Sequence, residues 1–324
     1  MLKIHYSLLL LKRRDKNSCF LHSLLSGNAL FYRSSSLKKF QKYSIFLQFL
    51  VICVKSPKQL SMIKKLSAII AVLLWSLPVF AAHPLMTDDT GTQGKGKFQL
   101  EYNGEYSRDV ERGASIVEKE TGGTVTAALT YGIVDNLDII IGFPWEWSSL
   151  NENGAVISDE KGMGDTSVEV KWRFYECKPQ ELSFALKPRM TIPTGDAQKG
   201  LGNGNISGGV LLIATKEWEH RALHGNIGYT HNSYAMEQDN AILKQDIWHA
   251  SLAAEVNITE KIRTVADISL DSNNEKKPDP NRVFLLGGII YRVTDNFDLD
   301  FGVKKGLNHA ETDKTILAGL TARF

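Results

Sequence analysis

Cysteine is scarce in this sequence, with three among 324 residues. Three are too few for a disulfide-dense scaffold, and neither a CxxC pair nor a zinc-type spacing of cysteine and histidine occurs. A large net charge is also missing, because 38 basic side chains stand against 36 acidic ones. This balance argues against a basic nucleic-acid-binding protein, and the ordinary charged fraction of 23% argues against a disordered chain.

The near-zero total conceals regions of opposite charge. Residues 1–61 contain 11 lysines and arginines but only one acid, Asp15. Residues 62–81 add two lysines, which leaves residues 82–324 with 25 basic and 35 acidic side chains. The sequence therefore divides into a basic leader and an acidic body of 243 residues.

Residues 62–81 have the layout of a bacterial signal peptide. Met62 is followed by two lysines, an apolar run over 66–80 and small residues, which predicts cleavage before Ala82. A transmembrane helix is the alternative, but this run is shorter than the roughly 20 residues that span a bilayer. Because a signal peptide begins a chain, we interpret residues 1–61 as a non-native or disordered extension. Residues 82–96 are then expected to be an N-terminal periplasmic segment.

Residues 97–324 repeat their apolar side chains with a period of two, which is the period of a β-strand. In one stretch, Val168, Val170, Trp172 and Phe174 alternate with Glu169, Lys171, Arg173 and Tyr175. No comparable helical stripe follows the signal peptide. The alternation predicts an all-β protein whose strands each have one apolar and one polar face.

Short and long connections also alternate along this region. Tight polar turns are predicted at 134–136, 176–180, 217–220, 259–261 and 294–296. Longer loops rich in Gly, Asn and Asp are predicted at 108–120, 148–164, 193–205, 234–244, 272–281 and 306–313. Eleven connections join twelve strands, and this layout is typical of a transmembrane antiparallel up-and-down β-barrel with short periplasmic turns and long external loops.

A soluble β-sandwich is the alternative fold, because it would bury similar alternating faces. The signal peptide favours the barrel, as do aromatic residues near the predicted strand ends, which suit interfacial girdles. These aromatic residues are Trp145, Trp147, Trp172, Trp248, Tyr102 and Tyr106. The last strand ends on the aromatic Phe324 and resembles the signal that the bacterial barrel-assembly machinery reads. We therefore predict an outer-membrane barrel over residues 97–324.

Three stretches resemble the "meta-pathway of phenol degradation" family of bacterial outer-membrane proteins. They are the segment HPLMTDDTGTQG at 83–94, GMGD at 162–165 leading into KWRF at 171–174, and PTGD at 193–196. The resemblance extends over residues 83–324. It implies an outer-membrane transporter linked to aromatic-compound metabolism and does not identify the substrate.

The polar faces of the predicted strands would line the lumen. The turn at 176–180 places Lys171 opposite Lys187 and Glu169 opposite Arg189, with Arg173 on the same wall. Like charges in direct opposition destabilise a dry sheet, so water or acids across the lumen must compensate them. The candidate acids are Glu101, Glu105, Glu146, Asp267, Asp298 and Asp300. Two interpretations remain open, an aqueous pore with a transverse field and an internal salt-bridge network that fills a narrow barrel.

Other chemistries have weaker support in the sequence. His249 and Ser251 have the spacing found in an outer-membrane phospholipase, but their strand face is predicted to point inward, away from lipid. The glycines at 200–209 lead into another strand and not into the helix that a phosphate loop needs. The acidic pairs at 88–89 and 159–160 lack an ordered calcium-ligand spacing. We expect no catalytic residue, no cofactor and no metal site.

The sequence thus predicts a non-enzymatic channel for passive uptake of small molecules, with aromatic or hydrophobic compounds implied by the family. The alternatives are a structural or adhesive barrel without conductance and a lipid-modifying enzyme. The expected partners are outer-membrane lipid, the barrel-assembly machinery and small solutes, and nucleic acid is not among them.

Overall fold

The computed structural model describes residues 83–113, 115–277 and 279–324. The predicted extension at 1–61 and the signal peptide at 62–81 lie outside these residues. Among the described residues, no helix is long and apolar enough to cross a membrane.

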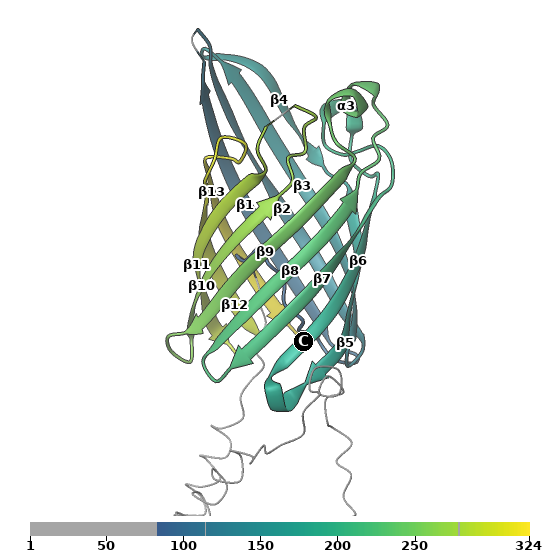
Figure 1. Cartoon of the computed structure of the whole chain (residues 1–324), viewed down its shortest axis with the longest axis vertical. Helices are drawn as coiled ribbons and strands as arrows, with labels where there is room; N and C mark the ends of the chain where they lie inside the picture. Colours follow the sequence, from purple (N-terminus) through teal and green to yellow (C-terminus); the bar gives the residue numbers. More distant parts are fainter. Residues whose placement is uncertain (1–82, 114, 278) are drawn as a thin grey trace, which may run out of the picture. The chain divides into compact units, whose positions relative to one another are not determined.

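The described chain is an antiparallel β-barrel (Figure 1). Its strands are β1 (Phe98–Arg112), β2 (Val117–Val134), β3 (Leu137–Glu152), β4 (Ala155–Met163), β5 (Thr166–Cys177), β6 (Leu182–Ile192), β7 (Ser207–Trp218), β8 (Arg221–His231), β9 (Asp246–Asn257), β10 (Ile262–Asp271), β11 (Arg282–Thr294), β12 (Phe297–Gly306) and β13 (Lys314–Arg323). β1 pairs with β13, which closes the sheet. β4 and β5 both pair with β3, at different heights, and so share one place in a ring of twelve. The predicted fold and strand number are confirmed.

The barrel wall has the predicted two faces. Large apolar side chains such as Leu252, Phe301 and Ile316 point outward and are about half exposed. Charged side chains such as Asp267 and Asp298 point inward and are almost fully buried. This distribution reverses that of a soluble protein and suits a barrel in a bilayer, where the outside must be apolar.

All five predicted short turns lie at one end of the barrel, which we call the short-turn end. The opposite, long-loop end differs from the prediction at two places. β1 and β2 continue to Arg112 and Val117, and β3 and β4 continue to Glu152 and Ala155, where long loops were expected at 108–120 and 148–164. These hairpins rise above the rim of the barrel (Figure 1). The expected loops are wrong here because a strand that faces water on both sides needs no apolar alternation.

Two of the remaining long connections contain short helices. The segment predicted as a loop at 193–205 includes the 3-10 helix η3 (Ala197–Lys199), and the one at 234–244 includes α3 (Glu237–Ile242). A further 3-10 helix, η2 (Lys178–Gln180), forms the turn between β5 and β6.

Candidate functional site

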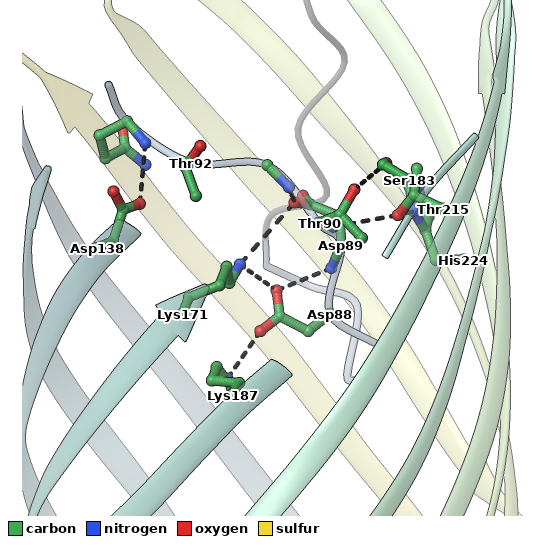
Figure 2. Close-up of polar contacts among 12 residues, drawn as sticks. Asp88, Asp89, Thr90, Thr92, Asp138, Lys171, Ser183, Lys187, Thr215 and His224 are labelled. Carbon is green, nitrogen blue, oxygen red and sulfur yellow. Dashed lines mark hydrogen bonds and ion pairs between the residues drawn. The ribbon is translucent and has the colours of Figure 1, made fainter. Parts of the chain in front are cut away.

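Residues 83–96, which we call the lumenal segment, run inside the barrel near the short-turn end (Figure 2). The sequence predicts a periplasmic segment at 82–96 and contains no signal for this internal position. Thr87, Asp89, Thr90 and Thr92 of the segment are all at most 5% exposed. The segment therefore packs in the lumen as a part of its interior.

Asp88 is the electrostatic centre of the segment. Its Oδ1 lies 2.6 Å from Nζ of Lys171, and its Oδ2 lies 2.7 Å from Nζ of Lys187 (Figure 2). Burial alone would raise the pKa of the Asp88 carboxyl, but the two ammonium groups outweigh burial and hold this pKa well below its usual range. Asp88 thus remains ionised and joins two lysines that would otherwise repel each other.

Asp89 is in a different electrostatic environment. Its side chain is 3% exposed and lies 3.9 Å from the Lys171 ammonium, while Gly91 donates its backbone N–H to it. Burial raises the pKa of Asp89 despite the opposing attraction of Lys171, and the Asp88 carboxylate adds to the rise. The pKa values of these two adjacent carboxyl groups are thus shifted in opposite directions.

Neutral hydrogen bonds hold the next residue of the segment. The Thr90 hydroxyl lies 2.5 Å from the Ser183 hydroxyl, and the Thr90 N–H donates to the Thr215 hydroxyl at 3.1 Å. The Thr215 hydroxyl is also 3.0 Å from Nδ1 of His224, which is fully buried. The segment is thus bound directly to β6 and β7 on this side of the lumen, and Thr215 links it to His224 of β8.

Acids of three other strands bind the two ends of the segment. His83 Nδ1 lies 2.5 Å from Asp300, the backbone N–H groups of Met86 and Thr87 donate to Asp267 at 2.9 and 2.8 Å, and that of Gln93 donates to Asp138 at 2.9 Å. These contacts join β12, β10 and β3 to one short stretch of chain.

Two glycines on the inner wall leave room for the segment. A Cβ atom built at Gly288 or Gly302 would lie 2.6 or 2.7 Å from the ring of Pro84, closer than real Cβ atoms approach a neighbour. Leu85 packs in a buried apolar cluster of the lumen with Leu286 and Leu317. The inner wall is therefore complementary to the segment in shape as well as in charge.

The structure brings the predicted basic residues together in the predicted register. Glu169 pairs with Arg189 and Trp172 with Leu186, which puts Lys171 opposite Lys187. Glu169 nevertheless makes its ion pair with Lys187, at 2.8 Å. Arg173 lies apart, near the short turns, with Glu176 at 3.7 Å.

The predicted acids have several different positions. Asp267 and Asp300 bind the lumenal segment, and Asp298 binds Arg323 at 2.8 Å. Glu101 accepts a hydrogen bond from Gln99, while Glu105 and Glu146 line a separate cavity of about 280 Å³. None of these six acids is within ion-pair distance of Lys171 or Lys187 among the described residues.

A larger cavity lies above the segment, toward the long-loop end. It has a volume of about 680 Å³, and residues 85–89 of the lumenal segment line it together with Lys187, Arg189, His249 and Phe284. The segment therefore forms the floor of a polar chamber inside the barrel.

Three polar side chains form a chain of hydrogen bonds on the inner wall. Asp271 lies 2.8 Å from Nδ1 of His249, and Nε2 of His249 lies 3.1 Å from the Ser251 hydroxyl. His249 and Asp271 line the chamber, so this group faces the lumen and not the lipid. No group of three or more His, Cys, Asp or Glu side chains in the described part of the chain could hold a metal ion.

Asp88 is not among the acids that the sequence predicts for the lumen, because all of those acids lie on the strands. The opposed Lys171 and Lys187 are the one signal that points to it, since they require a nearby acid. The spacing of the pair at 88–89 relates it only to a calcium ligand, and weakly.

The sequence and the barrel fold are similar to those of known proteins. The model of the family described as "Putative MetA-pathway of phenol degradation" matches residues 87–324. The COG4313 outer membrane channel from Pseudomonas putida F1 is similar with a TM-score of 0.55 at 12% identity, over 73% of this chain and 98% of that one. No curated protein matches the sequence.

Two further solved barrels are similar at lower scores. The translocator domain of the autotransporter NalP from Neisseria meningitidis gives a TM-score of 0.46 at 10% identity, over 71% of this chain and 89% of that one. The NanC porin gives a TM-score of 0.45 at 10% identity, over 69% of this chain and 98% of that one.

Proposed function

The chain belongs to the phenol-degradation family whose model it matches, and from that premise we propose that it is an outer-membrane channel for passive uptake of small molecules. Aromatic or other hydrophobic compounds are among the solutes we propose. The solute passes without chemical conversion. The similar barrel from Pseudomonas putida is an outer membrane channel, which is the role proposed here.

The observation that carries this proposal is the chamber of about 680 Å³ inside a barrel with an apolar outer surface. Small-molecule binding pockets commonly have volumes of this order, roughly 300–1,000 Å³. The chamber holds both charged and apolar side chains, so it can admit water and a small organic solute together.

The lumenal segment gives the proposed channel a floor. A solute that enters from the long-loop end meets Asp88, Asp89 and the residues around them before it reaches the short turns. Passage therefore requires the segment to move or to leave a narrow path beside it. The ion pairs of Asp88 with Lys171 and Lys187 oppose this movement.

Planar-bilayer recording of the refolded barrel tests the proposal. The expected result is discrete conductance steps that increase when the lumenal segment is released from the wall. A barrel that stays closed under all conditions, including after release of the segment, would contradict the proposal.

A structural or adhesive barrel without conductance is the second candidate, and a specific observation favours it. Asp138, His224, Glu255, Asp267 and Asp298 are each at most 2% exposed, so much of the lumen at the short-turn end is filled. The recording above separates the two candidates. A lipid-modifying enzyme is disfavoured, because the His249 and Ser251 side chains face the lumen.

We further propose that the protein reaches the outer membrane through the signal peptide that starts at Met62. Phe324 would then serve the barrel-assembly machinery. Its ring is exposed on the outer surface and stacks on Phe98 with 6.1 Å between centroids, so a partner can reach it.

A further inference from the structure

Arg189 differs from the other basic residues of the chamber in its partners. Lys171 lies within ion-pair distance of Asp88 and Asp89, and Lys187 within that of Asp88 and Glu169. Among the described residues, the Arg189 side chain makes no ion pair and has a single hydrogen bond, from Nη2 to the Thr230 hydroxyl at 3.4 Å. Its side chain is exposed to the chamber, so its guanidinium has donors available for a ligand.

The strands place a binding surface beside this guanidinium. Arg189 pairs with Gly209, Gly209 with Thr230, and Thr230 with Ile247, so one row crosses the inner wall from β6 to β9. Gly209 has no side chain, and the Thr230 hydroxyl lies within 2.8 Å of the place where its Cβ would be. The row thus places a hydroxyl directly beside the Arg189 cation, followed by an apolar side chain.

Apolar atoms complete this surface. Leu211, the next inward residue on β7, lines the same chamber as Ile247. A planar guanidinium matches the two oxygens of a carboxylate, and its flat face also accepts an aromatic ring. Leu211 and Ile247 would contact the apolar part of a ligand whose carboxylate is held by Arg189.

A neighbouring cavity of about 380 Å³ shares Arg189 and Thr230 with the chamber. That cavity is also lined by Glu146, Asp165 and Asp239, which would repel an anion. The chamber is also lined by acids, which are Asp88, Asp89, Glu101, Asp138, Glu169 and Asp271. Glu169, which pairs with Arg189 in the register, is bound by Lys187, as is Asp88, and Asp271 is bound by His249. The chamber side of Arg189 is therefore the favourable side for an anion.

We propose that the chamber binds small aromatic carboxylates, with Arg189 as the group that recognises the carboxylate. This inference rests on the proposed channel function and specifies a class of solute for it. Arg189 is a specificity-determining residue, because a neutral aromatic of the same shape gains the contacts to Leu211 and Ile247 but not the two charge-assisted hydrogen bonds.

Calorimetric titration of the refolded barrel in detergent at pH 8 tests the site. Benzoate is the probe, benzamide is its neutral counterpart of the same shape, and acetate is the anion without a ring. Benzoate should bind more tightly than either. Arg189→Gln should weaken benzoate about tenfold to a hundredfold, the loss expected for charge-assisted hydrogen bonds, and should leave benzamide unchanged.

Two further variants keep this test independent of folding. Arg173→Gln, which removes a lumen-facing arginine near Glu176, should leave benzoate binding unchanged. Arg189→Lys keeps the positive charge but not the paired N–H donors of the guanidinium, and should bind benzoate more tightly than Arg189→Gln but less tightly than the wild type. Equal binding of benzoate and benzamide, or full benzoate affinity in Arg189→Gln, would overturn the proposal.

Conductance separates this inference from the channel function. A barrel that binds benzoate as described but never conducts would refute the channel and retain the site. A barrel that conducts but does not distinguish benzoate from benzamide would retain the channel and refute the site.

Discussion

The strongest perturbation of the lumenal segment is Asp88→Asn. Asparagine has nearly the same shape as aspartate, so the change removes charge and little volume. It leaves Lys187 with Glu169 at 2.8 Å and Lys171 with Asp89 at 3.9 Å. Two ammonium groups on directly opposed residues then repel each other with one fewer carboxylate between them.

The free-energy cost of Asp88→Asn follows from the two ion pairs that it removes, those with Lys171 and Lys187. Removing one partner of a buried ion pair costs about 3–5 kcal/mol. The Asp88 side chain is 20% exposed, and water screens part of the loss, so we take about 3 kcal/mol, the lower end. At about 1.4 kcal/mol for each factor of ten, this favours the released segment about a hundredfold.

Hydrogen–deuterium exchange of the refolded barrel measures this shift directly. Backbone amides of the lumenal segment should exchange about a hundredfold faster in Asp88→Asn, while amides of the strands should be unchanged. Adding Lys171→Met should restore part of the protection, because an apolar group of similar volume removes one of the unmatched charges.

Lys95→Gln serves as the control, because Lys95 lies in the same segment but is exposed. Wild-type protection of the segment in Asp88→Asn would refute the reasoning. It would mean that the neutral hydrogen bonds and the packing of Leu85 hold the segment without the ion pairs.

Three further predictions address other parts of the account. Because burial raises the pKa of Asp89 above its ordinary 3.8, the stabilisation that Asp89 gives to the attached segment is complete below pH 3.8 and is lost as the pH rises through the raised pKa. The protection of the segment's amides, relative to their intrinsic exchange rates, should fall from pH 4 to 8 in the wild type and should fall less in Asp89→Asn. An equal fall in both proteins would contradict the prediction. Leu252→Arg, on the lipid-facing wall, should cost about 2–4 kcal/mol in urea unfolding from vesicles, whereas Val156→Arg, on a hairpin above the rim, should cost almost nothing; equal costs would mean that the membrane position is wrong. Phe324→Ala should reduce the assembled barrel in cells, assayed by its heat-modifiable migration, without impairing refolding in detergent; normal assembly in cells would exclude the C-terminal signal.

Much of the barrel wall could be predicted, because neighbouring residues in the sequence determine each strand and the turn that follows it. Alternation at 168–175 identifies a strand and its outer face from eight neighbouring residues. The short turn at 176–180 then fixes which residues oppose one another, and Glu169 does pair with Arg189. The extended hairpin of β3 and β4 was missed, although its Asn153-Gly154 pair is a strong turn signal. Both residues have positive φ angles, 51° and 89°.

The interior could not be predicted in the same way, because its contacts join distant parts of the chain. Asp88 is separated from Lys171 by 83 residues, and His83 from Asp300 by 217. No periodicity links such positions. The opposed lysines showed that an acid was needed, but only the fold shows that a segment preceding the first strand supplies it.

The central claim is that this barrel conducts small molecules past the lumenal segment, and single-channel recording tests it most directly. We predict small discrete conductance steps for the wild-type barrel and larger steps for a variant that lacks residues 83–93. The absence of any conductance in both proteins, with the strands correctly folded, would contradict a channel function.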